Sequence, residues 1–367
     1  MVVAWNYRFQ LAASTRLLSI IVILLSALAI IVLLTNTGED ALLSQSLIIP
    51  VSTASSQSHI DQGIITFESI SATNNAFNAS SNDVLVLLHI QKTGGTAFER
   101  HLVQDLGPQL NCSCTSEKRR CNCPRPSVKK RHSPSPPVTL ADTTWLISRF
   151  STGWVCGLHP DYTQLEECLS RLKVKLYFLT FLRHPLHRFV SEFRHVQRGA
   201  TWKASKSHCK QYDTQLCYKS QPHWSNVSLE EFLSCPNNMA INRQTKMLAN
   251  YKRDESGMIK CDESQAEQDR LLESAMANLR RIAFFGICEQ QKASQLVFEK
   301  TFKLEFSNEF SQSEDNKTRV FISKLSSGVV DKIVELNSLD MRLYEYALDL
   351  FKYRCNQLVN NNECNDG

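Results

Sequence analysis

The chain has 367 residues, of which 43% are hydrophobic and 21% are charged, and its formal net charge is +5. This usage excludes a largely disordered chain and leaves enough length for one large globular domain or two small ones. The net charge is modest, and we expect no nucleic-acid partner.

The first element in chain order is an apolar segment over residues 17–34, which contains no charged residue and two serines. As a helix it reaches roughly 27 Å, close to the hydrocarbon thickness of a thin bilayer. Arg8 and Arg16 precede the segment and Glu39 and Asp40 follow it, so the positive-inside bias places the N-terminus in the cytosol. We expect a signal-anchor transmembrane helix, because the apolar core of a cleaved signal peptide runs only about 7–15 residues.

The rest of the chain is expected to be luminal. Thirteen cysteines, beginning at Cys112, suit an oxidising compartment. Sequons that permit glycosylation begin at Asn78, Asn111, Asn226 and Asn316. The predicted organisation is a cytoplasmic tail at residues 1–16, the membrane span at 17–34, a Ser/Thr/Asn-rich stem at 35–83, a globular domain at 84–357 and a C-terminal tail at 358–367.

Strands and helices alternate along the globular domain. Residues 84–90 and 174–182 are nearly continuous apolar runs, typical of strands buried on both faces. This alternation predicts an α/β fold with a central parallel sheet flanked by helices. The other expected elements are helices at 96–106, 162–171, 185–196, 266–280 and 289–301, a strand at 282–287, and a final amphipathic helix marked by Leu336, Leu339, Leu343, Tyr346 and Leu350.

The loop after the first predicted strand, in LHIQKTGGTAF, combines features of an anion site. Backbone N–H groups and the helix dipole favour an anion at the start of the following helix. Gly94 and Gly95 allow a phosphate to approach closely, Thr93 and Thr96 add hydroxyl groups, and Lys92 adds a mobile charge. The lysine precedes the glycines, so the loop is not the triphosphatase pattern G-x-x-x-x-G-K-[ST]. A tight turn with a solvated lysine is the alternative.

A second phosphate-directed unit follows the strand at 174–182. Arg183 stands at the carboxyl end of that strand, where ligands of open α/β sheets bind. Ser191 lies about two turns into the next helix. Two such units on neighbouring strands suit a nucleotide with two separated phosphate groups, although an ordinary basic helix is the alternative.

Four segments together resemble the heparan sulfate 6-O-sulfotransferase family: LHIQKTGGTAFERHLV, WLISRFSTGWVCGLH, LRHPLHRFVSEFRHVQRGATWK and NLRRIAFFGICE. The resemblance covers nearly all of the chain from Val84 onward. It implies a P-loop-like sulfotransferase fold in a Golgi type II membrane protein. It also implies metal-independent sulfuryl transfer from 3′-phosphoadenosine 5′-phosphosulfate, abbreviated PAPS, to the 6-hydroxyl of glucosamine in heparan sulfate.

Three other functions stay open at this point. One is a sulfotransferase for another glycosaminoglycan position, and another is a luminal kinase, although no convincing magnesium-binding carboxylate pair is evident. The third is a catalytically inactive polyanion-binding membrane protein. Lys92 and His159, which match the leaving-group lysine and the catalytic base of the family, are both present and argue against the third.

The resemblance also implies which residues hold the donor. Lys92 is central and stabilises the leaving phosphate, while Arg183 and Ser191 hold the 3′-phosphate. The residues implied around the 5′-phosphosulfate are His89, Ile90, Gln91, Lys92, Thr93, Gly94, Gly95, Thr96 and Ala97. A further donor contact is implied at Phe310, Ser311, Gln312, Thr318 and Arg319.

His159 matches the catalytic base of the family, and His59 has no role in the mechanism. A sugar hydroxyl is a weak nucleophile at neutral pH, and a neutral imidazole within hydrogen-bond reach can take its proton. Tryptophans can pack flat against sugar rings while arginines pair with sulfates and carboxylates, although tryptophan is also an ordinary core residue. The implied acceptor site consists of Arg119, Arg120, Arg149, Trp154, His159, His195 and Trp202.

The cysteines suggest how a basic loop is held. Two C-x-C pairs bracket the basic cluster at residues 118–120, and in a luminal setting disulfides are favoured over zinc ligation. Cys156 and Cys168 are candidates for another disulfide near the base, and Cys288 resembles a buried free thiol. The paired cysteines of the first cluster are Cys112, Cys114, Cys121 and Cys123.

Three features depart from the family pattern. His184 replaces the aspartate that typically follows the 3′-phosphate arginine, and Pro160 replaces a small residue beside the base. A basic, proline-rich insert over residues 124–142 is longer than the corresponding family loop and is expected to be exposed. These departures concern donor affinity and acceptor preference more than the reaction type.

Overall fold

The computed structural model describes residues 63–73, 77–106, 110, 112–115, 120–126, 143–200, 224–235, 238–251, 264–310, 315–359 and 364. The chain divides into two units, residues 1–50 and 51–367, and every described residue belongs to the second. No helix within the described ranges is long and apolar enough to cross a membrane, and the anchor predicted at 17–34 lies outside them. Asn111 and most of the basic insert also lie outside.

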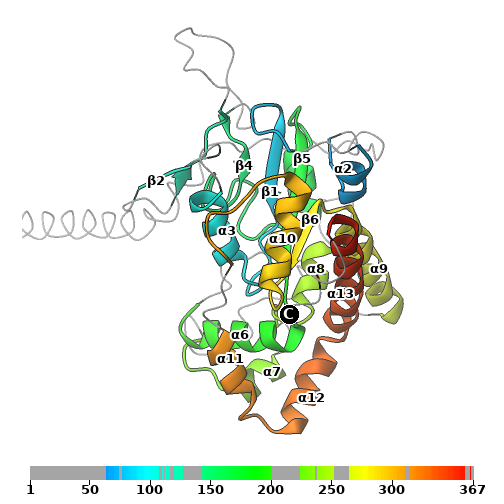
Figure 1. Ribbon diagram of the computed structural model, residues 1–367. Coiled ribbons are helices and arrows are strands. Elements are labelled where there is room, and N and C mark those ends of the chain that lie inside the picture. Colours follow the sequence, from blue (N-terminus) through cyan, green and yellow to red (C-terminus); the bar gives the residue numbers. More distant parts are fainter. Residues whose placement is uncertain are drawn as a thin grey trace, which may run out of the picture. The chain divides into compact units, whose positions relative to one another are not determined.

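A parallel sheet forms the centre of the fold, as the sequence predicts (Figure 1). Its order is β4-β1-β5-β6, with β1 between β4 and β5. Leu85 of β1 pairs with Leu146 of β4, and Leu87 pairs with Leu179 of β5. Every residue of β1 and β6 is buried, which explains their continuous apolar sequence. The bounds are Asp83–Leu87 for β1, Leu146–Ile147 for β4, Lys175–Leu182 for β5 and Phe284–Ile287 for β6.

Helices cover both faces of this sheet. Phe284 and Phe285 are successive residues of β6, so their side chains point to opposite faces. The Phe284 ring lies 5.2 Å from that of Phe298 in α10, and the Phe285 ring lies 6.0 Å from that of Phe351 in α13. One face therefore carries α3 (Gly95–Gln104) and α10 (Gln291–Phe302), and the other carries α5 (Tyr162–Leu169) and α13 (Ser338–Leu358).

A second apolar cluster lies beyond the carboxyl ends of the strands, where α6 directly follows β5 (Figure 1). Phe189 and Phe193 of α6 pack on Phe232 of α7, with ring centroids 5.2 and 5.4 Å apart. Ile333 of α12 is buried in the same cluster. The remaining helices are α6 (Pro185–Gln197), α7 (Leu229–Ser234), α8 (Arg243–Leu248), α9 (Gln265–Arg281), α11 (Asp315–Ile322) and α12 (Ser327–Leu336).

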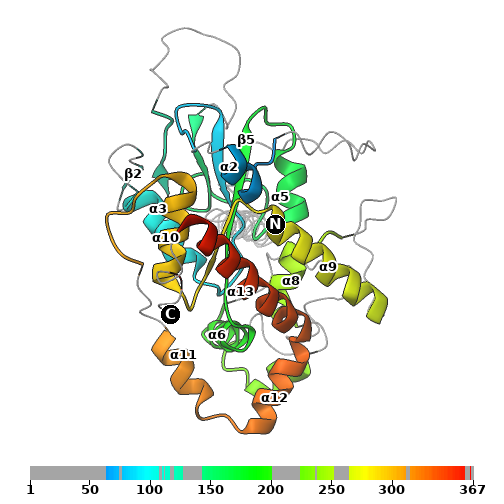
Figure 2. The same ribbon diagram turned by 45° about the vertical axis from the view of Figure 1, so that its right-hand side comes forward.

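Part of the segment assigned to the stem packs on the sheet and helices. Ile64 forms a parallel bridge with Leu176 of β5, and α2 (Phe67–Thr73) follows it. The Phe67 ring lies 4.6 Å from the Arg354 guanidinium of α13. Figure 2 shows α2 beside the strands, on the edge away from α6. The described residues 63–73 therefore belong to the globular body, because Phe67 and Ile70 are buried despite the lack of a sustained period.

Candidate active site

The predicted site residues follow the carboxyl ends of neighbouring strands. His89 comes after β1, Arg149 after β4, and Arg183 after β5. Because parallel strands end at one edge of a sheet, these side chains converge there. The two phosphate-directed units were predicted on neighbouring strands, and β1 and β5 are hydrogen-bonded neighbours.

The loop between β1 and α3 is closely packed. Gly94 caps α3 in the left-handed conformation with φ 90°, and Lys92 also has a positive φ of 68°. The Thr93 hydroxyl donates to the Ile90 carbonyl at 3.0 Å. A Cβ on Gly95 would lie 3.1 Å from Nδ1 of His89. A side chain at Gly95 would crowd His89, whereas the bare backbone can approach a phosphate at the N-terminus of α3.

Arg183 is joined to this loop. Its Nη1 donates to the Lys92 carbonyl at 3.3 Å, and its side chain is largely buried. Gln244 of α8 accepts from the Arg183 backbone N–H and donates to the Arg183 carbonyl, both at 2.9 Å. The Asp340 carboxylate of α13 in turn accepts from Gln244 N–H at 3.1 Å. The Arg183 backbone is therefore fixed by buried hydrogen bonds at the end of β5.

The Glu289 carboxylate, which follows β6, contacts several polar groups beside Arg183. Its Oε1 accepts from the His184 backbone N–H at 3.0 Å and lies 3.7 Å from Nδ1 of His187. The Tyr344 hydroxyl donates to its Oε2 at 2.8 Å. Burial alone would raise the pKa of Glu289, but these hydrogen bonds and the Arg183 charge hold it below the ordinary value. The pKa of His184 is lowered by burial and by the charge of His187.

Residues 148–153 form a compact turn after β4. The Ser148 carbonyl accepts N–H bonds from Ser151 at 3.2 Å, Thr152 at 2.9 Å and Gly153 at 3.2 Å. Gly153 has φ 75°, and a Cβ there would lie 2.9 Å from Cζ of Arg120. The predicted acceptor residue Arg120 therefore lies directly against this turn, and its Nη1 donates to the Thr152 carbonyl at 3.5 Å.

The predicted base, His159, packs against the donor loop, residues 88–96, in a cluster of aromatic rings. The His159 ring lies 4.5 Å from that of Trp154 and 5.4 Å from that of His89. Trp154 and His89 are 5.8 Å apart in an edge-to-face arrangement. The Arg149 guanidinium lies 5.8 Å from the Trp154 ring. The structure thus brings together His89, implied in donor binding, with Arg149, Trp154 and His159, implied in acceptor binding.

The backbone segment that carries His159 is tied to the start of α5. His159 has a positive φ of 51°, and two residues later Asp161 forms a capping box with Gln164 at the start of α5. The disulfide from Cys156 to Cys168 joins this segment to the same helix. Burial, followed by the charges of His89, Arg243 and Arg149, holds the pKa of His159 well below its ordinary value of 6.5. His159 is therefore neutral near neutral pH, the state that a proton acceptor requires.

The cysteine predictions are confirmed where the residues are described. Cys112 bonds to Cys123 and Cys114 to Cys121, which links β2 (Ser113–Cys114) to β3 (Cys121–Asn122) and brackets the basic cluster. Cys288 is a buried free cysteine. A Cβ on Gly94 would lie 3.2 Å from its Sγ, so the thiol packs directly against the donor loop.

The remaining predicted residues have varied surroundings. Ser191 is half-buried on α6, His195 is exposed on the same helix, and the Phe310 ring is buried against Phe98 at 5.8 Å. On α11, which packs on α6, Thr318 is buried and Arg319 is exposed. The predicted site residues that lie outside the described ranges are Arg119, Trp202, Ser311 and Gln312.

Several polar residues of the site were not predicted from the sequence. Glu289 was detectable, because it follows a buried strand at the same edge as Arg183. Gln244 and Asp340 gave no signal, because they contact each other from helices distant in the chain. Glu99 was not singled out either, and it is completely buried.

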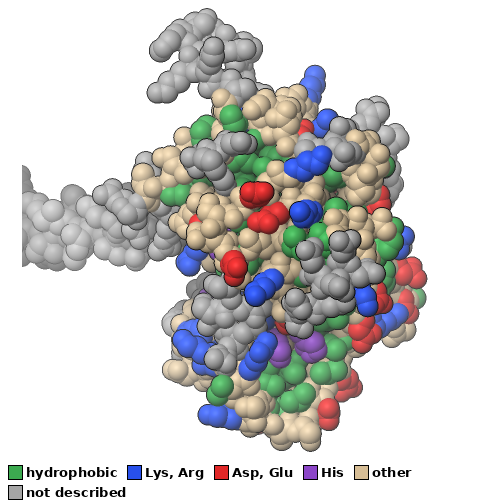
Figure 3. All heavy atoms as spheres, in the orientation of Figure 1, with side chains coloured by type: hydrophobic (Ala, Val, Ile, Leu, Met, Phe, Trp, Pro, Cys, Tyr) green, Lys and Arg blue, Asp and Glu red, His purple; other side chains and the backbone are tan. Residues whose placement is uncertain are grey.

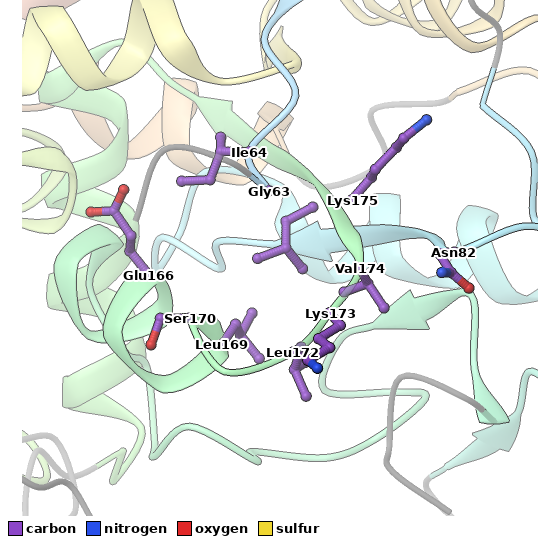
Figure 4. Close-up of a pocket in the computed structure, with 11 residues that line it drawn as sticks. Gly63, Ile64, Asn82, Glu166, Leu169, Ser170, Leu172, Lys173, Val174 and Lys175 are labelled. Carbon is purple, nitrogen blue, oxygen red and sulfur yellow. The ribbon is translucent and has the colours of Figure 1, made fainter. Parts of the chain in front are cut away.

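Basic side chains are concentrated on one part of the surface. In Figure 3, Lys, Arg and His side chains gather over the lower part of the molecule, where α6 and α11 lie in Figure 1. Exposed basic residues of this region include Arg198, Lys317 and Arg319. A cavity of about 430 Å³ lies at the opposite end of the sheet, beside the amino-terminal end of β5. Lys175 and Glu166 are among the residues that line it (Figure 4). That cavity is separate from the converging site residues.

Comparison with known proteins agrees with this geometry. The sequence profile of the sulfotransferase family matches residues 75–347. The chain is 42% identical over 293 residues to heparan-sulfate 6-O-sulfotransferase 1-B of Danio rerio, covering 76% of this chain and 68% of that protein. It is 42% identical over 294 residues to human heparan-sulfate 6-O-sulfotransferase 1, with coverage of 76% and 68%. For human heparan-sulfate 6-O-sulfotransferase 3 the identity is 42% over 300 residues, and the chain spans 59% of that relative's length.

Proposed function

The chain belongs to the heparan-sulfate 6-O-sulfotransferase family, and from this membership we propose that it transfers a sulfuryl group from PAPS to the 6-hydroxyl of glucosamine in heparan sulfate. The observation that carries the proposal is that the His159 ring contacts the rings of His89 and Trp154 at the carboxyl ends of the strands. A neutral base there stands beside a loop suited to a phosphosulfate, which is the arrangement that sulfuryl transfer to a hydroxyl requires.

The donor would be held by residues at two strand ends. The loop backbone at the start of α3 and the Lys92 side chain suit the 5′-phosphosulfate, while Arg183 at the end of β5 suits the 3′-phosphate. PAPS supplies the activated sulfuryl group, whose leaving group is the nucleotide 5′-phosphate. Lys92 places a positive charge where the charge of that phosphate rises as the S–O bond breaks.

His159 takes the proton of the attacking hydroxyl. Its pKa lies well below the ordinary value, so the imidazole is neutral without assistance from another base. Residues 148–160 are named the acceptor wall. In this wall Trp154, 4.5 Å from His159, presents a ring face for the sugar, while Arg149 and the adjacent Arg120 place positive charge for sulfates and carboxylates. The acceptor class that this wall suits is therefore an anionic polysaccharide.

The proposal extends to the cellular setting. An N-terminal signal anchor at residues 17–34 would hold the sulfotransferase domain in the Golgi lumen, as expected for a single-pass type II protein. The disulfides Cys112–Cys123, Cys114–Cys121 and Cys156–Cys168 support an oxidising compartment. Protease protection of the folded chain in intact membrane vesicles tests the orientation, and cleavage without permeabilisation contradicts it.

The decisive experiment for the reaction is position-specific. The purified chain is incubated with ³⁵S-labelled PAPS and desulfated heparin, and the product is digested to disaccharides. Label in the 6-O-sulfated glucosamine disaccharide is the expected outcome. Label at another position indicates a different glycosaminoglycan sulfotransferase, and salt-dependent heparin binding without transfer indicates an inactive polyanion-binding protein.

A further inference from the structure

Glu99 of α3 is a charged side chain in the interior of the protein. It is 0% exposed, although it lies on the helix that begins at the donor loop. A buried carboxylate is strongly unfavourable unless charged or hydrogen-bonding partners compensate it. Its partners therefore explain why the residue is there, and they all belong to the site described above.

The Glu99 carboxylate joins the ends of two neighbouring strands. Its Oε1 accepts from the Arg149 backbone N–H at 3.0 Å. Its Oε2 lies 3.2 Å from Nη2 of Arg149 and 3.3 Å from Nδ1 of His89. Arg149 follows β4 and His89 follows β1, so one carboxylate on α3 fixes the direction of both segments.

The two partners of Glu99, Arg149 and His89, make further contacts with the donor loop and with the acceptor residues. Nη2 of Arg149 also donates to the Thr96 hydroxyl in the donor loop at 3.0 Å, and its guanidinium lies beside Trp154. The His89 ring lies beside both Trp154 and His159. Glu99 thereby contacts the two residues that link the donor loop to the predicted acceptor wall.

We propose that Glu99 is a positioning residue for sulfuryl transfer, which sets the orientation of Arg149 and His89 and through them aligns the acceptor wall with the donor loop. The inference rests on the proposed function and deepens it. A charged partner directs Arg149 along Thr96 and Trp154, where an unpaired arginine side chain would sample many rotamers. Alignment of this kind contributes to the rate because small displacements of reacting groups cost large factors in turnover.

The test separates alignment from binding. Glu99→Gln keeps a carbonyl oxygen for the Arg149 backbone N–H and removes the charge that faces its guanidinium and His89. We expect kcat to fall at least about tenfold. We expect the Kd for adenosine 3′,5′-bisphosphate, measured by calorimetry, to change less than about threefold, because the fully buried Glu99 side chain cannot itself touch a bound nucleotide. An unchanged kcat in the folded variant overturns the proposal.

A double-mutant cycle with Arg149→Met identifies the route of the effect. If Glu99 acts through Arg149, the double variant should have nearly the same kcat as Arg149→Met alone. If instead the fold-losses in kcat of the two single variants multiply in the double variant, Glu99 acts independently of Arg149, and the proposed coupling is overturned. The matched control is Glu166→Gln, because Glu166 pairs with Arg281 at 3.6 Å beside the cavity at the other end of the sheet.

Two further outcomes are distinguishable. If wild-type protein transfers no sulfuryl group to any position, the proposed function fails and the inference fails with it. If Glu99→Gln does not fold, Glu99→Asp decides the question, because it retains the charge but withdraws the carboxylate by one bond of about 1.5 Å. Wild-type kcat in folded Glu99→Asp then overturns the proposal, and a reduced kcat with an unchanged Kd supports it.

Discussion

The donor loop and the acceptor wall meet in one site but are built differently. The donor loop, residues 88–96, runs from the end of β1 into the first turn of α3, and its neighbour Arg183 is fixed at the end of β5. The acceptor wall comprises residues 148–160, which contain neither helix nor strand. Bonds to the Ser148 carbonyl, a disulfide and contacts to Glu99 hold it instead. One region is therefore shaped by regular secondary structure and the other by individual cross-links.

The largest expected effects are losses of kcat, which test the separate chemical roles of the donor loop and the acceptor wall. We expect Lys92→Ala and His159→Ala each to lower kcat at least about 10²-fold, because one removes leaving-group stabilisation and the other removes the base. Lys92→Ala should also weaken binding of adenosine 3′,5′-bisphosphate, whereas His159→Ala should not. Single-turnover assays and calorimetry measure both quantities. Near-normal turnover in a folded variant would remove that residue from its role.

The disulfide of the acceptor wall should matter for both stability and transfer. Cys156 and Cys168 are 12 residues apart in sequence, and replacing both by alanine should lower the free energy of unfolding by about 2–4 kcal/mol. Transfer should fall by a larger factor than the affinity for adenosine 3′,5′-bisphosphate. Chemical denaturation and acceptor kinetics measure these effects.

The matched control for that change is the disulfide from Cys355 to Cys364, which are 9 residues apart in sequence at the end of α13. Its removal should reduce stability while leaving the kinetics of the remaining folded protein unchanged. An equal loss of donor affinity and transfer after removal of Cys156–Cys168 would contradict the distinction between the two regions.

A smaller effect is expected where the two regions touch. Gly95→Ala would place a Cβ 3.1 Å from Nδ1 of His89, so the loop or the ring must shift. We expect adenosine 3′,5′-bisphosphate to bind about tenfold more weakly, equivalent to about 1.4 kcal/mol. Gly328→Ala in α12, where a Cβ would meet no atom within 4 Å, is the control. Unchanged affinity in Gly95→Ala would show that the loop tolerates this shift.

The smallest expected effect concerns pH. Because the folded-state pKa of His159 lies below 6.5, the base stays neutral above that pH, and loss of kcat/KM from its protonation should begin only below it. An acid limb with its midpoint at or above 6.5 in the kcat/KM profile would contradict this.

Stability should follow the same titration. The unfolded chain takes up a proton on His159 as the pH falls through about 6.5, whereas the folded protein resists that proton until lower pH. The contribution of this group is therefore fully present above about pH 6.5 and is lost as the pH falls toward the folded-state value. Between pH 7.5 and 5, the free energy of unfolding, measured by chemical denaturation, should fall more steeply with decreasing pH in wild type than in His159→Gln.

Much of the donor side followed from the sequence. The apolar runs at residues 84–90 and 174–182 predicted buried parallel strands, and the glycines with Lys92 predicted an anion loop, because these signals are local. The family motifs also supplied His159, Arg149 and Trp154. The short strand β4 and the helices α7 and α8 escaped prediction, because stretches of two or six residues are too short to show a period.

Tertiary structure decided how those residues act together. Sequence alone determined the fold class, the family and the residue types that carry the chemistry, since each is encoded in contiguous motifs. Only the folded chain placed His89 within 5.4 Å of His159 and buried Glu99 against Arg149, 50 residues away in sequence. The physical reason is that the pairing of β4 with β1 brings distant strand ends to one edge, and burial there turns an ordinary helical glutamate into a link between two segments.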